Sequence, residues 1–243
     1  MEKHIEYFKV EVDDVSVNHE MKINVLQKKI QNVSDNHGSI LGFGFDDMSN
    51  IGLFWVVTRL TVEILRLPIL NESFRIETWL ETPGRVGINR YYKLFVENEL
   101  IVYGVAKWAL VNRNTLTVER LDQFDFMNEI DYLDEVLSFR LPVLKKLQRR
   151  NTEDQHLTIR LCATKEMLDH NNHVNNTEYI KMALEEFNDL RKIRMYQISY
   201  GVAIYEGQTI EMTRYSEDSE TYVEGYVIDA FGSRNLSFQV RIL

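Results

Sequence analysis

The chain has 243 residues, of which 44% are hydrophobic and 27% charged, the composition of a globular protein with a core of its own. Its formal net charge of −9 argues against binding nucleic acid without sequence preference, because such binding needs a concentrated positive surface. No run approaches about 20 consecutive apolar residues, so we expect no membrane span, and the N-terminus lacks the apolar segment of a signal peptide. The single Cys162 excludes an internal disulfide and suits a reducing compartment, so the expected location is cytoplasmic.

The first part of the chain predicts a strand and a helix. Residues 1–17 alternate in polarity, which indicates a leading strand. From Asn18 an apolar stripe at three- and four-residue spacing predicts an amphipathic helix. The run Asp35-Asn36-His37-Gly38 is expected to end that helix in a turn, which would leave His37 at the surface. Residues 39–51, with Gly42, Gly44 and many polar side chains, are expected to form a loop.

Four β-rich runs follow, and each break between them carries turn-forming residues. The runs are Phe54 to Leu67, Ser73 to Glu81, Ile88 to Glu97 and Leu100 to Asn112. Alternation in the first run predicts one face formed by Phe54, Val56, Leu60, Val62 and Ile64. The other face would carry Trp55, Arg59 and Glu63.

The segment 113–150 differs in composition, because it is rich in acidic residues with aromatic residues between them. We interpret it as a linker that packs on the body of the protein through those aromatics. The predicted boundaries are 1–120 for an N-terminal half, 121–152 for the linker and 153–243 for a C-terminal half.

The second half repeats the first in outline. A strand at about His156 to Thr164 precedes a polar loop and a helix that extends to Leu190. Four further strands are expected near Met195 to Tyr205, Gln208 to Ser216, Thr221 to Asp229 and Arg234 to Ile242. Because strand, helix and four strands occur twice, we predict an α+β double hot-dog fold, in which two antiparallel sheets each wrap a long helix.

The polar loop is the densest functional signal in the chain. Residues 169–176 contain one carboxylate, two imidazoles and four carboxamides. Asp169, Asn171 and His173 are two residues apart, so an extended segment directs them the same way, whereas a helix would align only Asp169 with His173. We therefore expect an extended loop.

The sequence also predicts where the following helix begins. Asn175 is the expected N-cap, and Glu178 is expected to return a hydrogen bond to the cap in a capping box. The positive end of the helix, at Asn175 and Asn176, would then lie beside the loop, where an oxyanion could be held.

These residues also have interpretations other than catalysis. Asparagine caps helices and tolerates left-handed backbone, so Asn172, Asn175 and Asn176 are mainly expected to be structural. A metal site formed by Asp169, His170 and His173 is disfavoured, because a structural zinc usually takes four ligands and no cysteine pair accompanies them. We expect no metal and no cofactor, and His170 as a spacer. Cys162 lies in an alternating apolar segment, which favours a small buried residue over a catalytic thiol.

The motif Asp169-x-Asn-x-His-Val-Asn-Asn, followed by Tyr179 and an amphipathic helix, resembles the active-site segment of the acyl-acyl carrier protein thioesterases of plants and bacteria. The resemblance covers nearly the whole chain. It implies hydrolysis of fatty acyl-acyl carrier protein to free fatty acid and carrier protein in fatty acid biosynthesis. The catalytic residues would be Asp169, Asn171 and His173, and the partner would be acyl carrier protein with a phosphopantetheine-linked acyl chain.

Those residue types suit thioester hydrolysis. An imidazole such as that of His173 titrates near neutral pH and can act as base or proton shuttle. Asp169 can orient the imidazole or polarise a water, and Asn171 can position the water or the thioester carbonyl.

In the resembled family, a glutamate lies on the strand after this helix, with a cysteine beside it in plant members. Alignment by the hairpin glycine places Ala203 and Ile204 at those positions, so a cysteine nucleophile is not expected. Glu206 could supply the missing carboxylate from a shifted register, although a turn residue is the favoured interpretation.

The acidic chain would need a local basic patch to dock an acidic carrier protein. The candidates are Lys145, Lys146, Arg149 and Arg150, and a second group, Arg191, Lys192 and Arg194. Solvated surface residues are an equally good interpretation of both groups. The alternatives to the main hypothesis are an acyl-CoA thioesterase and a non-catalytic acyl-thioester-binding protein. The sequence leaves the oligomeric state open, with a homodimer as the candidate assembly.

Overall fold

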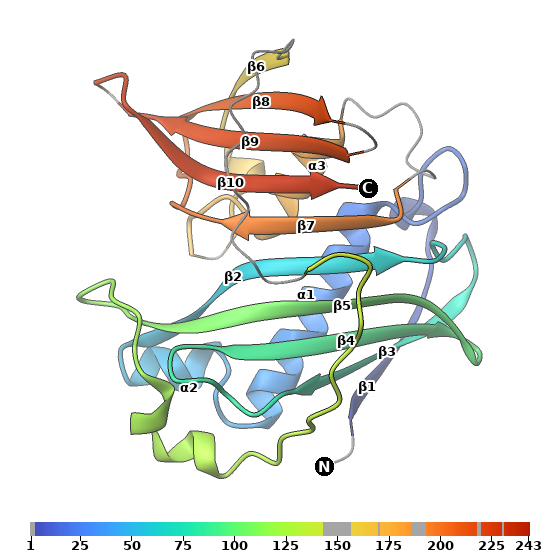
Figure 1. Ribbon diagram of the computed structural model, residues 1–243, viewed down its shortest axis with the longest axis vertical. Helices are drawn as coiled ribbons and strands as arrows, with labels where there is room; N and C mark the ends of the chain where they lie inside the picture. Colours follow the sequence, from blue (N-terminus) through green and yellow to red (C-terminus); the bar gives the residue numbers. More distant parts are fainter. Residues whose placement is uncertain (1–2, 143–156, 170, 186–192, 218–219, 230) are drawn as a thin grey trace. The chain divides into compact units, whose positions relative to one another are not determined.

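The computed structural model describes residues 3–142, 157–169, 171–185, 193–217, 220–229 and 231–243 (Figure 1). The chain divides into two compact units, Met1–Leu144 and Lys145–Leu243. Among the helices of these described ranges, none is long and apolar enough to cross a bilayer.

The N-terminal unit is built on an antiparallel sheet in the order β1-β3-β4-β5-β2. The strands are β1 (His4–Lys9), β2 (Leu53–Ile64), β3 (Ser73–Leu80), β4 (Ile88–Val96) and β5 (Glu99–Asn112). The four strands predicted after residue 53 are confirmed to within a few residues, because β-branched and aromatic runs end at turn-forming residues. The leading strand is shorter than the predicted 1–17, since β1 ends at Lys9 and Val12–Asp14 form a 3-10 helix.

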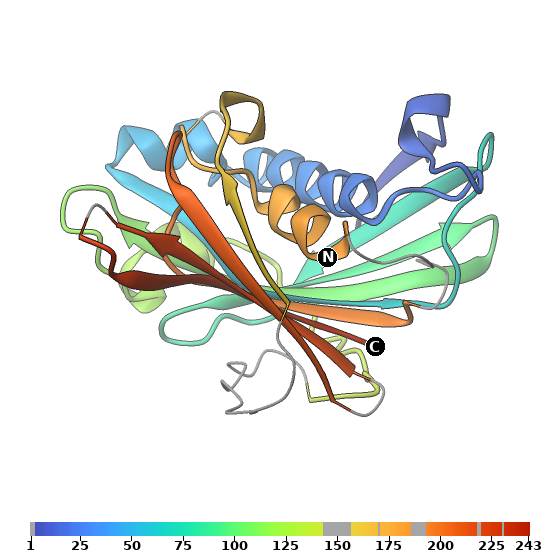
Figure 2. The same ribbon diagram turned by 90° about the horizontal axis from the view of Figure 1, so that it is seen from above.

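Helix α1 (Ile23–Ile40) lies along one face of this sheet (Figure 2). It continues through residues 35–38, so the predicted end of the helix is wrong. The buried stripe extends through Ser34 and His37, whose polar side chains gave no apolar signal in the sequence. Ser34 Oγ lies 2.8 Å from Tyr92 Oη on β4, so the sheet supplies the hydrogen bond that this buried hydroxyl needs.

His37 and Arg90 form a buried polar pair between α1 and the sheet. The guanidinium of Arg90 donates a hydrogen bond of 2.7 Å to Nδ1 of His37, which requires a neutral, accepting imidazole. Burial, then the charge of Arg90, then His4 lower the pKa of His37 from 6.5 to about 3. His37 is only 4% exposed, so its expected surface position is also wrong.

Residues expected to form a loop contain the short helix α2 (Phe45–Asn50). The carboxylate of Asp47 accepts the N–H of Gly44 at 2.9 Å and so satisfies one free donor at the start of the helix. Met48 is buried in a cluster with Phe43 and Leu53. A helix of six residues is too short to show a repeating apolar stripe, which explains why the sequence did not predict it.

Strand β2 contains a β-bulge between Val57 and Arg59, where its register with β5 shifts by one residue. The extra residue reverses the alternation of side chains along the strand. Phe54 therefore shares a face with Glu63, and not with Leu60 as the unbroken alternation predicted. The predicted faces are wrong for the N-terminal part of this strand.

The segment after β5 packs on the N-terminal unit through its aromatic residues, as predicted. Phe124, Phe126 and Tyr132 pack against one apolar cluster of the unit. Further along, Phe139 packs against a second cluster that contains Trp79. The indole N–H of Trp79 also donates to the backbone oxygen of Glu135 at 3.0 Å, which fastens this segment to the sheet.

The C-terminal unit has an antiparallel sheet in the order β7-β10-β9-β8-β6. The strands are β6 (Leu157–Cys162), β7 (Met195–Tyr200), β8 (Thr209–Glu217), β9 (Glu220–Ile228) and β10 (Arg234–Ile242). Helix α3 (Asn176–Leu184) packs on this sheet, with the ring of Tyr179 4.9 Å from that of Phe238. The remainder of the predicted helix, residues 186–190, lies outside the described residues.

Candidate active site

The predicted catalytic loop is a tight turn at the start of α3. Leu168 and Val174 form an antiparallel bridge across it. The N–H of Asp169 donates to the carbonyl of His173 at 2.8 Å, and Asn172 has a φ of 61°, in the left-handed region that asparagine tolerates. The helical alternative is excluded, and the expectation of an extended segment is wrong because the chain reverses here.

The carboxylate of Asp169 holds this turn together. Its Oδ1 atom accepts the backbone N–H of Asn171 at 2.8 Å and, more weakly, that of His173 at 3.4 Å. This is an Asx-type turn, in which the side chain takes the place of a backbone acceptor. The structure therefore brings Asp169, Asn171 and His173 together, but it joins Asp169 to the backbone of His173 and not to its ring.

The start of α3 confirms half of the predicted cap. Oδ1 of Asn175 accepts the N–H of Thr177 at 2.9 Å, so Asn175 is the N-cap. The carboxylate of Glu178 instead pairs with Lys181 at 3.0 Å. The predicted capping box is wrong, because the backbone N–H of Asn175 donates to Met167 at 2.8 Å.

Several amides at this end of α3 are already engaged. Val174 donates its N–H to Ile204, Thr177 to the cap side chain, and Glu178 to the carbonyl of Asn175. The oxyanion role expected for Asn175 and Asn176 therefore depends mainly on the positive end of the helix dipole, equivalent to roughly half a charge.

A second segment, residues 201–208, lies against the turn. The N–H of Val174 donates to the carbonyl of Ile204 at 2.8 Å, and the rings of His173 and Tyr205 meet edge to face, with centroids 5.0 Å apart. Sequence reasoning missed Tyr205, because its contact joins two loops that no periodic pattern relates. Glu206 is exposed in the turn that follows, as the favoured interpretation predicted.

Tyr179, on the first turn of α3, is packed behind the loop. Burial is the main cause that raises the pKa of its phenol to about 12, and the charge of Asp169 acts in the same direction. Its ring is 4% exposed and lies against Tyr200 and Phe238. This packing anchors the helix directly behind the candidate site.

Other predicted participants are placed differently. Cys162 is exposed on β6, so its expected burial is wrong. No group of three His, Cys, Asp or Glu side chains able to hold a metal occurs within the part of the chain that the structure describes, and His170 lies outside that part. The basic residues proposed to dock a carrier protein also lie outside it, except Arg194.

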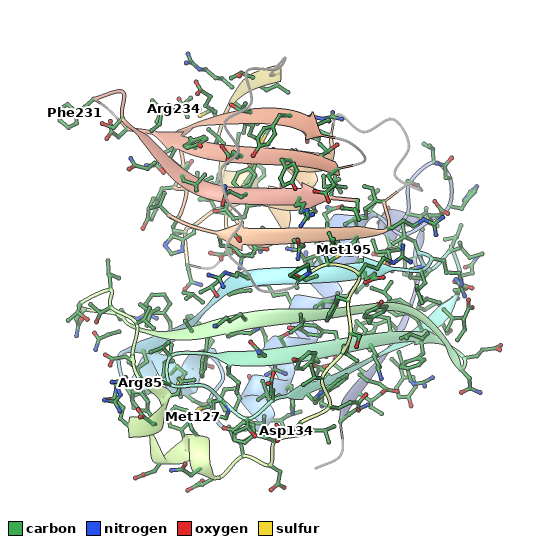
Figure 3. All side chains as sticks on the ribbon, in the orientation of Figure 1. Arg85, Met127, Asp134, Met195, Phe231 and Arg234 are labelled. Carbon is green, nitrogen blue, oxygen red and sulfur yellow. The ribbon has the colours of Figure 1, made fainter. Side chains whose placement is uncertain are left out.

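A groove of about 810 Å³ lies in the N-terminal unit. Its lining includes the buried side chains of Leu121 and Met127 and the charged Arg85 and Arg120. Two of these residues, Arg85 and Met127, are labelled in Figure 3. All of its lining residues fall between Thr82 and Tyr132, so none of the predicted catalytic residues contributes to it.

Both units of the chain match models of one protein family. Residues 1–130 match the acyl-ACP thioesterase N-terminal domain, and residues 148–241 match the acyl-ACP thioesterase C-terminal domain. The chain belongs to the acyl-ACP thioesterase family. Among its relatives, the chloroplastic oleoyl-acyl carrier protein thioesterase of Coriandrum sativum is 30% identical over 200 residues, which cover 74% of this chain and 52% of that protein. Oleoyl-acyl carrier protein thioesterase 2 of Arabidopsis thaliana is 28% identical over 219 residues, which cover 80% of this chain and 58% of that protein. The chain thus spans little more than half the length of these relatives.

Solved acyl-ACP thioesterases share the fold. An acyl-ACP thioesterase from Bacteroides thetaiotaomicron superposes with a TM-score of 0.83 at 24% identity, covering 99% of this chain and 97% of that chain. The 12:0-ACP thioesterase from Umbellularia californica gives a TM-score of 0.82 at 20% identity, with coverages of 99% and 96%. The predicted α+β double hot-dog fold is confirmed.

This acyl-ACP thioesterase family member has Ala203 and Ile204 beside the candidate turn, where the family resemblance implied a glutamate and a cysteine. Ile204 is fully buried, and its backbone carbonyl accepts a hydrogen bond from the N–H of Val174. Neither side chain can act as acid, base or nucleophile. Of the candidate residues described so far, the side chains that could act as acid or base are therefore Asp169 and His173 of the turn and the exposed Glu206.

Proposed function

We propose that this protein hydrolyses the thioester of fatty acyl-acyl carrier protein and releases a free fatty acid during fatty acid biosynthesis. Membership of the acyl-ACP thioesterase family supports the reaction class. The observation that carries the proposal is the hydrogen-bonded turn in which Asp169 fixes the backbone of both Asn171 and His173.

In this proposal, His173 is the general base. Its side chain is half-buried, which leaves part of the ring open to a substrate. The imidazole takes a proton from water as the oxygen attacks the thioester carbon, and it returns a proton to the departing thiolate of phosphopantetheine. A positioned base of this kind contributes roughly 10² to 10⁴ in rate.

Asn171 and Asp169 have supporting roles. The carboxamide of Asn171 lies on the exposed side of the turn, where it can orient the water or the thioester carbonyl. Asp169 acts through the backbone, because its Oδ1 atom is the acceptor that closes the turn. The positive end of α3 favours negative charge on the carbonyl oxygen in the transition state.

A thiol-release assay with purified protein tests the reaction class. Acyl-carrier-protein thioesters and the matching acyl-CoA thioesters would be compared over a series of chain lengths. The proposal expects turnover with carrier-protein substrates and a lower kcat/KM with CoA at equal chain length. Faster turnover with CoA would make the protein an acyl-CoA thioesterase. Ligand-induced thermal stabilisation without turnover would make it a non-catalytic acyl-thioester-binding protein.

We also propose a cytoplasmic location and a homodimer. The single cysteine, exposed on β6, suits a reducing compartment. Strand β1 ends the strand order of the N-terminal unit, and Tyr7 on it is 78% exposed, so this strand is the edge proposed to pair with a second copy. Cell fractionation tests the first proposal, since recovery outside the cytoplasmic fraction would contradict it. Light scattering after size exclusion tests the second, since a monomer mass would contradict it.

A further inference from the structure

We infer that Tyr205 is a positioning residue that orients the imidazole of His173. The inference rests on the proposed function, because it assigns a role within that active site. It concerns a residue that the sequence motif does not contain, 32 positions beyond His173.

The geometry of the two rings supports this role. Their centroids are 5.0 Å apart and their planes lie at 84°, which is the edge-to-face arrangement that aromatic pairs favour. Within the described part of the chain, no hydrogen bond holds the ring of His173. The contact with Tyr205 is therefore the interaction that fixes the plane of the imidazole once Asp169 has fixed its backbone.

Tyr205 is itself held in place from both sides. Its N–H donates to Oε1 of Gln208 at 2.8 Å, and its carbonyl accepts the N–H of Gln208 at 3.2 Å, which closes a β-turn. Gly207 occupies the third position of that turn with a φ of 77°, a left-handed conformation that glycine adopts without strain. The N–H of Gly207 donates to the carbonyl of Ala163 at 2.9 Å, which ties the turn to the end of β6.

The exposure of Tyr205 separates this role from that of a core residue. It is 49% exposed, whereas its neighbour Ile204 is fully buried. The ring therefore does not serve mainly to fill the core. An aromatic ring packed edge to face against the imidazole limits its rotation, and a misplacement of about 1 Å can cost about 10² in rate.

Two substitutions test the inference. Tyr205→Phe keeps the aromatic face and removes only the hydroxyl, whereas Tyr205→Leu keeps an apolar side chain and removes the face. Phe231→Leu is the matched control, because Phe231 is 95% exposed at the tip of the β9–β10 hairpin and points away from the sheet (Figure 3). Since Tyr205 is half exposed, leucine at this position is compatible with the fold.

Kinetics provide the first readout. We expect Tyr205→Leu to lower kcat by roughly tenfold to a hundredfold with KM within about twofold, because binding is retained while the base is misaligned. Tyr205→Phe and Phe231→Leu should keep kcat within about twofold of wild type. An unchanged kcat in Tyr205→Leu would overturn the inference, as would an equal loss in Tyr205→Phe.

NMR of labelled histidine provides a readout that does not depend on activity. The ring resonances of His173 are assigned by their loss in His173→Gln. In Tyr205→Leu they should move toward those of the exposed His19, and in Tyr205→Phe they should stay in place, because ring-current effects need the aromatic face. Unmoved resonances in Tyr205→Leu would overturn the inference. A wild-type protein that releases no thiol would overturn the proposed function alone, since these resonances would still establish or refute the ring contact.

Discussion

Replacing Asp169 separates two roles that the carboxylate could have, holding the turn and acting on the substrate. Asp169→Ala removes the acceptor for the N–H groups of Asn171 at 2.8 Å and His173 at 3.4 Å. A hydrogen bond to a charged group contributes about 1.5 to 3 kcal/mol, and the longer bond adds little. We therefore expect a loss of about 2 kcal/mol in the free energy of unfolding. Asp169→Asn keeps an oxygen acceptor at the same place, so it should cost under about 1 kcal/mol.

Activity should depend on whether the side chain at position 169 still holds the turn, and not on its negative charge. Because Asp169 reaches His173 through the backbone, Asp169→Asn should retain kcat within about tenfold, whereas Asp169→Ala should lose about 10² or more by displacing the base. Urea unfolding measures the stability, and release of carrier-protein thiol measures the activity.

Asp229 offers a matched control within the same unit. Its Oδ1 atom accepts the N–H groups of Phe231 at 2.9 Å and Ser233 at 2.8 Å, which is the same type of turn in the β9–β10 hairpin. Asp229→Ala should loosen that hairpin and leave kcat unchanged. The reasoning would be refuted if Asp169→Asn were as inactive as Asp169→Ala while keeping wild-type stability, since the carboxylate charge would then take part in the chemistry itself.

Three further predictions concern stability. His37 is buried and its pKa is about 3. Between pH 6.5 and 3, His37 is therefore protonated in the unfolded chain and neutral in the folded protein. The free energy of unfolding should fall by about 2 kcal/mol from pH 8 to pH 5 on this account, and His37→Gln should flatten that dependence in urea titrations. A Cβ at Gly225 would lie 2.0 Å from the ring of the fully buried Phe238, so Gly225→Ala should cost about 1 to 3 kcal/mol, whereas Gly84→Ala, with only a 3.5 Å contact, should be neutral by the same measurement. Asn175→Ala removes the N-cap of α3 and should cost about 1 kcal/mol, and restoration by Asn175→Ser would show that the cap is the cause.

The sequence predicted the strands well and the ends of α1 poorly, for one physical reason. Strand boundaries are marked by local residues, such as the prolines and asparagines between β-rich runs. The last turns of α1 depend on tertiary partners, because the buried polar side chains of Ser34 and His37 bond to Tyr92 and Arg90, on a strand more than 50 residues away. The bulge in β2 is likewise a property of its pairing with β5.

In the candidate site, too, the local features were predictable from the sequence and the tertiary ones were not. Asp169, Asn171 and His173 are near neighbours in the sequence, so their proximity follows from the motif whatever the loop does. The form of the loop does not follow, because an aspartate that accepts backbone N–H groups reverses the chain that spacing alone would extend. Tyr205 comes from a separate loop and is brought to His173 by backbone pairing, which leaves no mark in residue periodicity.

The most direct test of the central claim is the rate of thiol release from acyl-acyl carrier protein by wild-type protein and by His173→Ala, measured at saturating substrate and neutral pH. The account predicts turnover by the wild type and a loss of roughly 10² to 10⁴ in kcat on removal of the imidazole, with Phe231→Leu unchanged. Equal rates in wild type and His173→Ala would contradict the account, because the turn would then hold no general base.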